Sequence, residues 1–382
     1  MDPTTWAERA QAAADSVNSG FGHRTLGPVP GTWIASVARP SQRVRAPWAP
    51  WHYWWQAHYL DCLVDAAERR RAESGGEPRE LVLARHLLAG IRIRNGFRYR
   101  NWFYDDMAWL ALAADRLGRL LGRTGAGGEG TAATLAAARE LGRELVSADT
   151  DDLGGGLFWN TRRRYKNTAS TGPGALFFAR TGDRARAQRL VDWLGATLLD
   201  PEQGLYLDGL NLTPDGSGEL VRDIWTYNQG PVLGALLELG GSDNLARAAA
   251  LVQAVAERLT VEVAHDGVPL RALRGDGGGD GGLFMGILAR YLAEAALDDR
   301  LPDAARSTAR ALVAATAESL WAGAELRAEP GRGRRGGTWW TFPQKPGETA
   351  SDAYPPGSRV ELSTQLQAWM AFEGAHRLAQ GD

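Results

Sequence analysis

The chain has 382 residues, more than the roughly 100–200 of a typical domain, so it forms either two domains or one large closed architecture. Apolar residues make up 44% and charged residues 23% of the sequence, which excludes an intrinsically disordered chain. The 43 Lys and Arg residues balance 45 Asp and Glu residues, and a net charge of -2 offers no basic field to a nucleic acid or an anionic membrane.

Most of the chain has the periodicity of helices. Apolar residues recur at three- and four-residue spacing, Ala and Leu dominate, and alternating runs of Val, Ile and Thr are nearly absent, which predicts an all-α protein. Capping residues and breakers place twelve helices, in chain order, at 4–18, 51–73, 78–94, 104–123, 131–147, 167–182, 184–199, 224–239, 242–259, 281–296, 302–321 and 361–378. Twelve helices make six pairs.

Short and long connections alternate between these helices. Short ones, such as 74–77, 181–183 and 240–242, predict antiparallel neighbours. Long ones fall near 19–50, 148–166, 200–223, 260–280 and 322–360, and loops of such length usually carry function. The alternation places all the long loops on one face.

Six antiparallel hairpins in a ring form an (α/α)6 barrel, a six-hairpin toroid, and this architecture accounts for residues 1–382 as a single domain. The alternative is an open stack of helix pairs, as in a solenoid, which would repeat with a period near 34 residues. The sequence shows no such repeat, so we expect the closed barrel.

The first residues and the hydropathy of the chain bear on its location. The N-terminus has neither the basic nor the apolar segment of a signal peptide, and no uninterrupted apolar run approaches about 18 residues. We therefore expect a cytoplasmic protein without a membrane partner, or a secreted one if a leader has been removed.

The predicted long loops are rich in aromatic residues, whereas linkers usually carry Gly, Ser, Pro and charge. The loop aromatics are Trp33, Trp48, Trp51, Trp102, Trp159, Tyr165, Tyr206, Trp339, Trp340 and Tyr354. Exposed rings gathered on one face indicate a ligand surface.

Two adjacent carboxylates, Asp105 and Asp106, stand among aromatic residues at the start of the predicted helix 104–123. Aspartates in a first helical turn often only cap free N–H groups, and we interpret the pairs at 151–152 and 298–299, in polar surroundings, in that way. Aromatic walls lower the local dielectric, so one of two neighbouring carboxyls should keep its proton at neutral pH. That suits the acid and the nucleophile of glycosidic-bond cleavage, and adjacent side chains favour the short separation of a retaining mechanism.

Further aromatic and amide side chains occur at comparable helix starts. The sets are Trp54-Trp55-Gln56, then Trp159-Asn160 with Tyr165-Lys166-Asn167, then Trp225-Thr226-Tyr227-Asn228-Gln229-Gly230. Rings that pack on sugar C–H faces and amides that bond hydroxyls suit a carbohydrate, although a single Trp or Tyr at helical spacing is more often part of the core.

Five blocks in chain order carry a more specific signal. They are Tyr53-Trp54-Trp55-Gln56-Ala57 with Leu60-Asp61, Tyr104-Asp105-Asp106-Met107-Ala108-Trp109, Tyr165-Lys166-Asn167, Thr226-Tyr227-Asn228-Gln229-Gly230 through Leu239, and Phe284-Met285-Gly286-Ile287-Leu288 through Leu292. Together they resemble glycoside hydrolase family 76 over about residues 50–295.

The resemblance implies an (α/α)6 barrel that cleaves α-1,6-linked mannose with retention, an α-1,6-mannanase-like glycoside hydrolase. It assigns Asp105 as the nucleophile that forms the mannosyl-enzyme, and Asp106 as the general acid that later activates water. The candidate sugar contacts are Trp54, Gln56, Trp102, Tyr104, Asn160, Tyr165, Asn167, Tyr227, Asn228, Gln229 and Asp280. We expect an oligosaccharide substrate, a monomer and no cofactor.

No metal site is expected. The single cysteine, Cys62, excludes zinc sites with two thiolates, and the six histidines lack zinc-ligand spacing. The glycine-rich run 275–282 matches the spacing of a dinucleotide-binding fingerprint. That motif requires a preceding strand, however, and the sequence predicts none there. Asp276 and Asp280 of that run could hold Ca²⁺, but we interpret it as a loop whose Asp280 leans into the cleft.

Two other functions stay open. A sugar epimerase or isomerase on the same barrel would use His52 or His58 to move protons at carbon. A helical carbohydrate-binding protein would keep the cleft without turnover. The basic run 332–335 would steer an anionic sugar if it faced the cleft.

Overall fold

The computed structural model describes residues 2–27, 29–41, 49–74, 77–124, 128–265, 267–328 and 338–381. Within them lie all twelve expected helices, each ending within two residues of its predicted bounds, and one further short helix, α12 (Ala350–Ala353). The basic run 332–335 and Trp48 lie outside the described residues.

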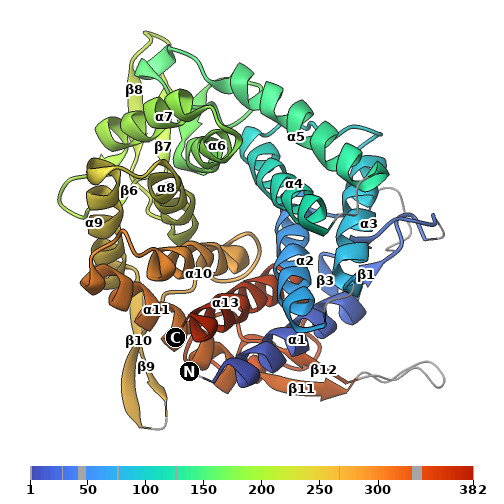
Figure 1. Ribbon diagram of the computed structural model, residues 1–382. Helices are drawn as coiled ribbons and strands as arrows, with labels where there is room; N and C mark the ends of the chain where they lie inside the picture. The colour runs from blue at the N-terminus through green and yellow to red at the C-terminus, as the bar shows by residue number, and fades with distance from the viewer. Residues whose placement is uncertain are drawn as a thin grey trace.

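Six helices form an inner ring. They are α2 (Tyr53–Ser74), α4 (Tyr104–Thr124), α6 (Thr168–Thr181), α8 (Thr226–Leu239), α10 (Gly281–Leu297) and α13 (Leu362–Gln380). Each contacts the next in this order, and α13 contacts α2, so the ring closes (Figure 1). The expected helical toroid is confirmed.

Six helices form an outer layer around that ring. They are α1 (Pro3–Gly20), α3 (Arg79–Arg94), α5 (Glu129–Ala148), α7 (Arg184–Thr197), α9 (Ser242–Arg258) and α11 (Asp303–Ala322). The outer helix α9 buries residues at three- and four-residue spacing, such as Ala248, Leu251 and Val255, as expected for one apolar face. In α6, by contrast, every residue from 168 to 179 is buried, because neighbours surround an inner helix on all sides.

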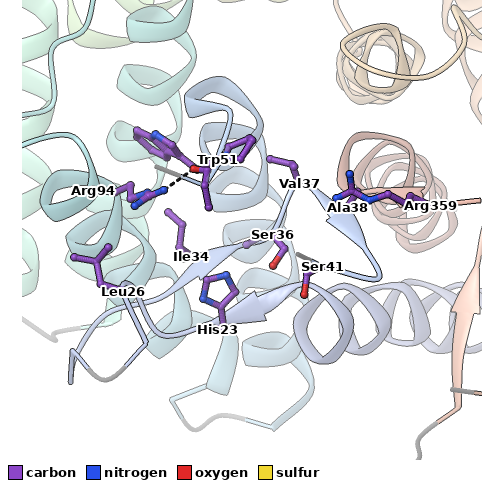
Figure 2. A pocket seen from close by; sticks show the side chains of 13 residues that line it. His23, Leu26, Ile34, Ser36, Val37, Ala38, Ser41, Trp51, Arg94 and Arg359 are labelled. Carbon is purple, nitrogen blue, oxygen red and sulfur yellow. Dashed lines mark hydrogen bonds between the residues drawn. The ribbon is translucent and has the colours of Figure 1, made fainter. Parts of the chain in front are cut away.

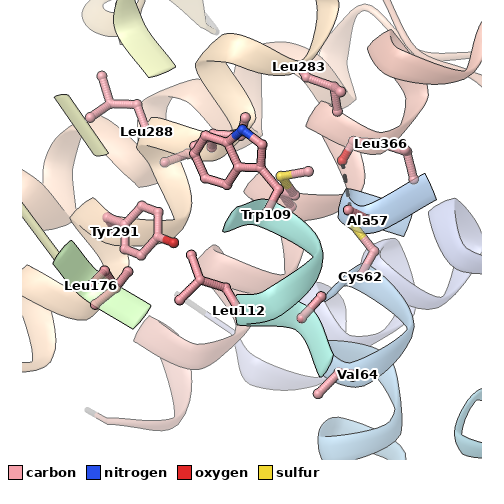
Figure 3. Packing of buried hydrophobic residues seen from close by; sticks show 14 of the residues in the cluster. Ala57, Cys62, Val64, Trp109, Leu112, Leu176, Leu283, Leu288, Tyr291 and Leu366 are labelled. Atoms are coloured by element: carbon pink, nitrogen blue, oxygen red, sulfur yellow. Dashed lines mark hydrogen bonds between the residues drawn. The ribbon is translucent and has the colours of Figure 1, made fainter. Parts of the chain in front are cut away.

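Close approach of the inner helices depends on small residues. A Cβ atom at Gly230 or Gly234 of α8 would lie 2.8 or 2.7 Å from the ring of Tyr291 on α10, so only glycine fits. Figure 3 shows this layer of the core, where Tyr291, Trp109 and Leu176 from three inner helices gather. It lies beneath the face that carries the site.

The long connections fold into short antiparallel strands, which the weak strand signal in the sequence did not predict. The strands are β1 (Gly22–His23), β2 (Ile34–Ala35), β3 (Ala38–Arg39), β4 (Tyr165–Asn167), β5 (Leu199–Asp200), β6 (Leu205–Tyr206), β7 (Gly209–Leu212), β8 (Gly218–Val221), β9 (Thr260–His265), β10 (Val268–Leu273), β11 (Glu325–Ala328), β12 (Thr338–Thr341) and β13 (Val360–Glu361). The order β4-β7-β8 joins two different long loops in one sheet. Pairing of this kind is non-local, so short strands leave little trace in local sequence.

Every inner helix is entered from a long or medium connection, and short connections lead on to the following outer helix. The N-termini of the inner helices therefore meet at one end of the ring, which we call the loop face. Their unsatisfied N–H groups and dipoles favour negative charge there. None of the helices in the described ranges has the length and apolar content of a membrane span.

Candidate active site

A cleft of about 480 Å³ opens on the loop face. Its lining comes from the starts of α2, α4, α6, α8 and α10 and from the connections before them: Trp54, Asp105, Asp106, Trp109, Trp159, Tyr165, Asn167, Asp208, Trp225, Tyr227, Asp276, Asp280, Gly281 and Phe284. All the charged side chains in this lining are aspartates, and most of the others are aromatic.

Asp105 accepts two N–H donors that fix its carboxyl group. The backbone N–H of Asp106 donates to Oδ1 at 2.9 Å, and the indole of Trp159 donates to Oδ2 at 2.9 Å. Burial raises the pKa of Asp105 to about 7, although both donors stabilise the carboxylate and oppose this shift.

Asp106 lies in a different electrostatic setting. Asn101 donates to its Oδ2 at 2.6 Å, but burial and the neighbouring charge of Asp105 hold the pKa of Asp106 well above its usual value, and Asp280 adds to the effect. Of the two, Asp106 is therefore the carboxyl that holds its proton more firmly, while Asp105 ionises more readily.

The raised pKa of Asp106 predicts a pH-dependent cost in stability. The unfolded carboxyl ionises near pH 3.8, whereas the folded one keeps its proton, so the free energy of unfolding falls as the pH rises above that value. Asp106→Asn should remove this cost and raise the melting temperature at pH 7 by about 2–4 °C, with no gain near pH 4. Calorimetry from pH 4 to 7 measures the difference, and a gain that is independent of pH would contradict it.

An aromatic wall faces Asp105 and Asp106 across the cleft. The indole N–H groups of Trp54 and Trp55 donate to Asp280 Oδ1 at 3.0 and 2.8 Å. The rings of Tyr227 and Phe284 stack with centroids 3.9 Å apart, and Phe284 lies 6.2 Å from Trp54. The wall thus combines flat apolar faces with a fixed carboxylate, which suits a sugar.

Asp208, which the sequence did not single out, supplies a further carboxyl to the cleft. The Tyr165 hydroxyl donates to its Oδ2, and Asn228 donates to its Oδ1 at 3.0 Å. Burial raises the pKa of Asp208. The residue belongs to the connection between β6 and β7, where no pattern in the sequence marks it, and its place is set when β7 pairs with β4 beside Tyr165.

Lys166 is a buried side chain that stabilises the turn at residues 150–155, next to the cleft. Its ammonium group is buried and donates to the backbone oxygens of Thr150, Asp152 and Gly155, each at 2.7 Å. Burial lowers the pKa of Lys166 to about 8. The preceding strand residue is Tyr165, whose backbone oxygen accepts the backbone N–H of Trp159 at 2.7 Å. This segment therefore also positions the indole that donates to Asp105.

Lys166→Met is expected to destabilise the protein by about 3–5 kcal/mol, because three backbone oxygens would lose their donor at a buried position. Urea denaturation monitored by tryptophan fluorescence measures the loss. The chain's other lysine, Lys345, is about half exposed, and Lys345→Met is a matched control that should change stability by less than about 0.5 kcal/mol. Equal effects of the two substitutions would refute the role of Lys166.

The structure brings seven of the thirteen predicted site residues into the lining of the cleft. They are Trp54, Asp105, Asp106, Tyr165, Asn167, Tyr227 and Asp280. Asn167 is also the N-cap of α6, where its side-chain oxygen accepts the backbone N–H of Ser170. The lining also contains residues that were not among the predicted contacts, including Trp109, Trp159, Trp225, Asp276 and Phe284. Trp109 and Phe284 lie within the recognised blocks, Trp225 directly precedes one, and Trp159 comes six residues before another.

Two predicted contacts, Gln56 and Gln229, need correction. Both are buried and bond the backbone of a neighbouring loop residue in both directions: Gln56 bonds N and O of Ala35, and Gln229 bonds N and O of Tyr206. Gln365 does the same with Phe342. Each glutamine is the fourth residue of an inner helix, so this position anchors the preceding loop and leaves no amide for sugar.

Four other predicted contacts also lie outside the cleft lining. Tyr104 is buried in the core, and the side chain of Asn160 accepts the backbone N–H of Arg162 to hold a turn. Asn228 is buried behind Asp208 and acts on that carboxyl. Trp102 is 69% exposed and lines a neighbouring hollow.

The two histidines proposed for an epimerase do not line the cleft. The ring of His52 stacks on Trp55 at 4.4 Å. His58 lies beneath Trp54 and Trp109, its Nε2 has no hydrogen-bond partner among the described residues, and burial lowers its pKa to about 3. Neither imidazole can exchange a proton with a sugar in the cleft.

The alternative of a Ca²⁺ site at Asp276 and Asp280 finds no geometric support. Asp276 accepts the Thr226 hydroxyl and pairs with Arg274, and Asp280 accepts the two indoles. Across the described ranges, His, Cys, Asp and Glu side chains form no group of three or more that could hold a metal ion.

A second hollow, of about 280 Å³, lies beside the connection that leads into α2 (Figure 2). His23, Trp51 and Arg94 border it, and the Arg94 guanidinium bonds the backbone oxygen of Ala49. Its lining, within the part of the chain that the structure describes, contains no Asp or Glu. It therefore offers no carboxyl pair for acid and nucleophilic catalysis.

Comparison with known proteins finds a matching family model and several similar solved structures. The family model described as glycosyl hydrolase family 76 matches residues 5–352. The alpha-1,6-mannanase GH76A of Salegentibacter sp. HEL1_6 is similar at 31% identity over 98% of this chain and 99% of that chain, with a TM-score of 0.76. An inactive variant of that mannanase, with two adjacent aspartates replaced by asparagine, was solved in complex with alpha-1,6-mannotriose. This structure is 30% identical to the chain, with the same coverage and the same TM-score.

A further similar structure is the Lin0763 protein of Listeria innocua, at 25% identity over 100% of this chain and 99% of that chain, with a TM-score of 0.77. No curated protein sequence matches the chain.

Proposed function

The chain belongs to glycosyl hydrolase family 76, and from this premise we propose that it hydrolyses α-1,6-linked manno-oligosaccharides with retention of configuration. Membership makes it a glycoside hydrolase with a helical barrel. The proposal adds the sugar, the linkage and the roles of two aspartates. Support for the sugar comes from the similar mannanase of Salegentibacter, whose inactive variant binds alpha-1,6-mannotriose.

The observation that carries the proposal is the unequal environment of two adjacent carboxyls on the cleft surface. Asp105 receives two N–H bonds that favour its charged form, while burial and the charge of Asp105 raise the pKa of Asp106 well above its usual value. A double displacement needs one ionised and one protonated carboxyl. The inactive mannanase variant, which also changes two adjacent aspartates, supports the choice of this pair.

In the first step, the Asp105 carboxylate attacks the anomeric carbon from the face opposite the glycosidic oxygen. Asp106 donates its proton to that oxygen as the C–O bond breaks, so the leaving sugar departs with a neutral hydroxyl and a mannosyl ester remains on Asp105. The indole of Trp159 stabilises the carboxylate before attack and when it is released again.

In the second step, the Asp106 carboxylate takes a proton from water, and the resulting hydroxide attacks the anomeric carbon and displaces Asp105. Two inversions restore the α configuration, and Asp106 is again protonated. The rise in its pKa makes it both a competent acid in the first step and a competent base in the second.

A screen of p-nitrophenyl glycosides and α-1,6-manno-oligosaccharides, with NMR of the first-formed anomer, tests the proposal. We expect turnover of the α-1,6-linked substrates and an α-anomeric product before mutarotation. A β-anomer would refute retention, turnover restricted to another linkage would refute the substrate, and binding without turnover would show a carbohydrate-binding protein.

We propose that the enzyme acts as a monomer, because the cleft of a single chain already contains both carboxyls and the aromatic wall that the proposed mechanism uses. Light scattering coupled to size-exclusion chromatography would contradict this if the active species had twice the mass of the chain.

A further inference from the structure

A donor-rich hollow lies next to the catalytic pair on the loop face. It has a volume of about 300 Å³, and we call it the arginine hollow; its lining residues are Asn95, Arg98, Arg100, Asn101, Trp102, Glu144 and Thr161. Asn101 belongs to this lining and donates to Asp106 of the cleft at 2.6 Å. A single side chain therefore connects the arginine hollow with the general acid.

The arginine hollow is lined by two cationic side chains, Arg98 and Arg100, and by one carboxylate, Glu144. The Arg98 guanidinium and the Trp102 indole N–H make no hydrogen bond or ion pair within the described part of the chain, and Arg100 has one ion pair, 3.5 Å long, with Glu144. In the cleft, by contrast, the charged lining groups are all aspartates. An anionic group would be repelled by the cleft and attracted to the arginine hollow.

The backbone that presents these arginines is fixed. Asn95 Nδ2 donates to the backbone oxygens of Arg98 and Arg100 at 3.0 and 2.9 Å, and Glu140 on α5 accepts the backbone N–H groups of Tyr99 and Arg100 at 2.9 and 3.1 Å. A guanidinium on a fixed backbone loses less conformational entropy when it binds. An arrangement of this kind is suited to recognition.

The indole of Trp102 adds a sugar-sized apolar surface. Its ring is exposed, and its backbone oxygen accepts the N–H of Thr161 at 3.0 Å, which fixes the backbone from which the ring projects into the lining of the arginine hollow. The turn after Thr161 carries three more exposed arginines, at 162–164, which extend the positive charge along this rim. An exposed ring next to cationic donors suits a sugar that bears a negative group.

We propose that the arginine hollow is an accessory subsite for an anionic substituent, a phosphate or a carboxylate, on the glycan whose mannosidic bond lies in the cleft. Arg98 and Arg100 bind the anion, and Trp102 stacks on the sugar that carries it. The inference rests on the proposed function for the identity of the glycan, but binding of the anion can be measured without turnover.

The test compares kcat/KM for α-1,6-mannotetraose with the values for the same tetrasaccharide carrying one phosphomonoester and for a tetrasaccharide carrying one uronic acid carboxylate. For Arg98→Ala/Arg100→Ala, the anionic-to-neutral ratio should fall about tenfold at low salt, and the wild-type ratio should itself decrease as the ionic strength rises. The control, Arg189→Ala/Arg271→Ala, removes the same charge from exposed positions on α7 and β10 and should keep the ratio.

A fall for the phosphate substrate alone would identify phosphate as the ligand, a fall for the carboxylate substrate alone would identify carboxylate, and an unchanged ratio for both would overturn the proposal. Calorimetric titration of the Asp105→Asn/Asp106→Asn protein with the same three oligosaccharides tests the anion subsite separately from the proposed hydrolysis of mannosides. A preference for the anionic sugars that is lost with the arginines supports the subsite even if the wild type fails to hydrolyse mannosides, and equal affinities refute it even if hydrolysis is found.

Discussion

Asp105→Asn is expected to lower kcat for α-1,6-mannotetraose by about 10⁴-fold or more. The amide cannot form the mannosyl ester, so the route through a covalent intermediate is closed. Some rate above the uncatalysed reaction should remain, because substrate binding and electrostatic stabilisation still act after one catalytic group has been removed. Single-turnover product analysis measures the loss, and mass spectrometry should detect no mannosyl-enzyme.

The control for Asp105→Asn is Asp299→Asn, which changes an exposed member of another adjacent pair and should leave kcat within twofold. Calorimetry should show that Asp105→Asn still binds the oligosaccharide, since Trp54 and Tyr227 continue to form the wall of the cleft. Full activity of Asp105→Asn would exclude Asp105 as the nucleophile and with it the double displacement.

Asp106→Asn is expected to show a loss that depends on the leaving group. For an oligosaccharide, whose leaving hydroxyl needs a proton, the rate should fall by about 10²–10⁴-fold. For p-nitrophenyl α-mannoside, whose phenolate leaves without a proton, formation of the intermediate should be nearly normal, and slow hydrolysis should let the mannosyl-enzyme accumulate. The expected time course is a burst of p-nitrophenol release followed by a slow steady-state rate.

Azide provides the second measurement on Asp106→Asn. A small anionic nucleophile needs no general base, so it should speed the second step and yield α-mannosyl azide. An equal loss of rate on both substrates, with no burst and no azide product, would contradict the assignment of Asp106 as acid and base. The pair of variants thus assigns the two roles separately.

Helices and their order could be predicted from sequence because the signals are local. Apolar spacing and breakers placed twelve helices within two residues of their observed bounds, and the alternation of connection lengths predicted that one face would carry the long loops. The strands in those loops could not be predicted, since β4, β7 and β8 acquire partners only when loops from different hairpins meet.

The roles of the glutamines were misassigned for a similar reason. Gln56 and Gln229 stand beside aromatic residues in the recognised blocks, and an amide is a natural partner for a sugar hydroxyl. The structure turns them toward Ala35 and Tyr206, where each pairs with both backbone groups of one residue. Residues two apart at the start of a helix point in different directions, so Trp54 faces the cleft while Gln56 faces a loop.

The helical barrel, the family and the adjacent aspartates could be predicted from the amino-acid sequence, because periodicity, caps and a contiguous motif are properties of short segments. Which carboxyls share the cleft depends on long-range packing, which no short segment records. Asp208 and Asp276 come from separate loops, far from Asp105 along the chain, and they meet in the cleft only when the ring closes and brings five helix starts together. The burial that raises the pKa of Asp208 likewise exists only in the folded chain.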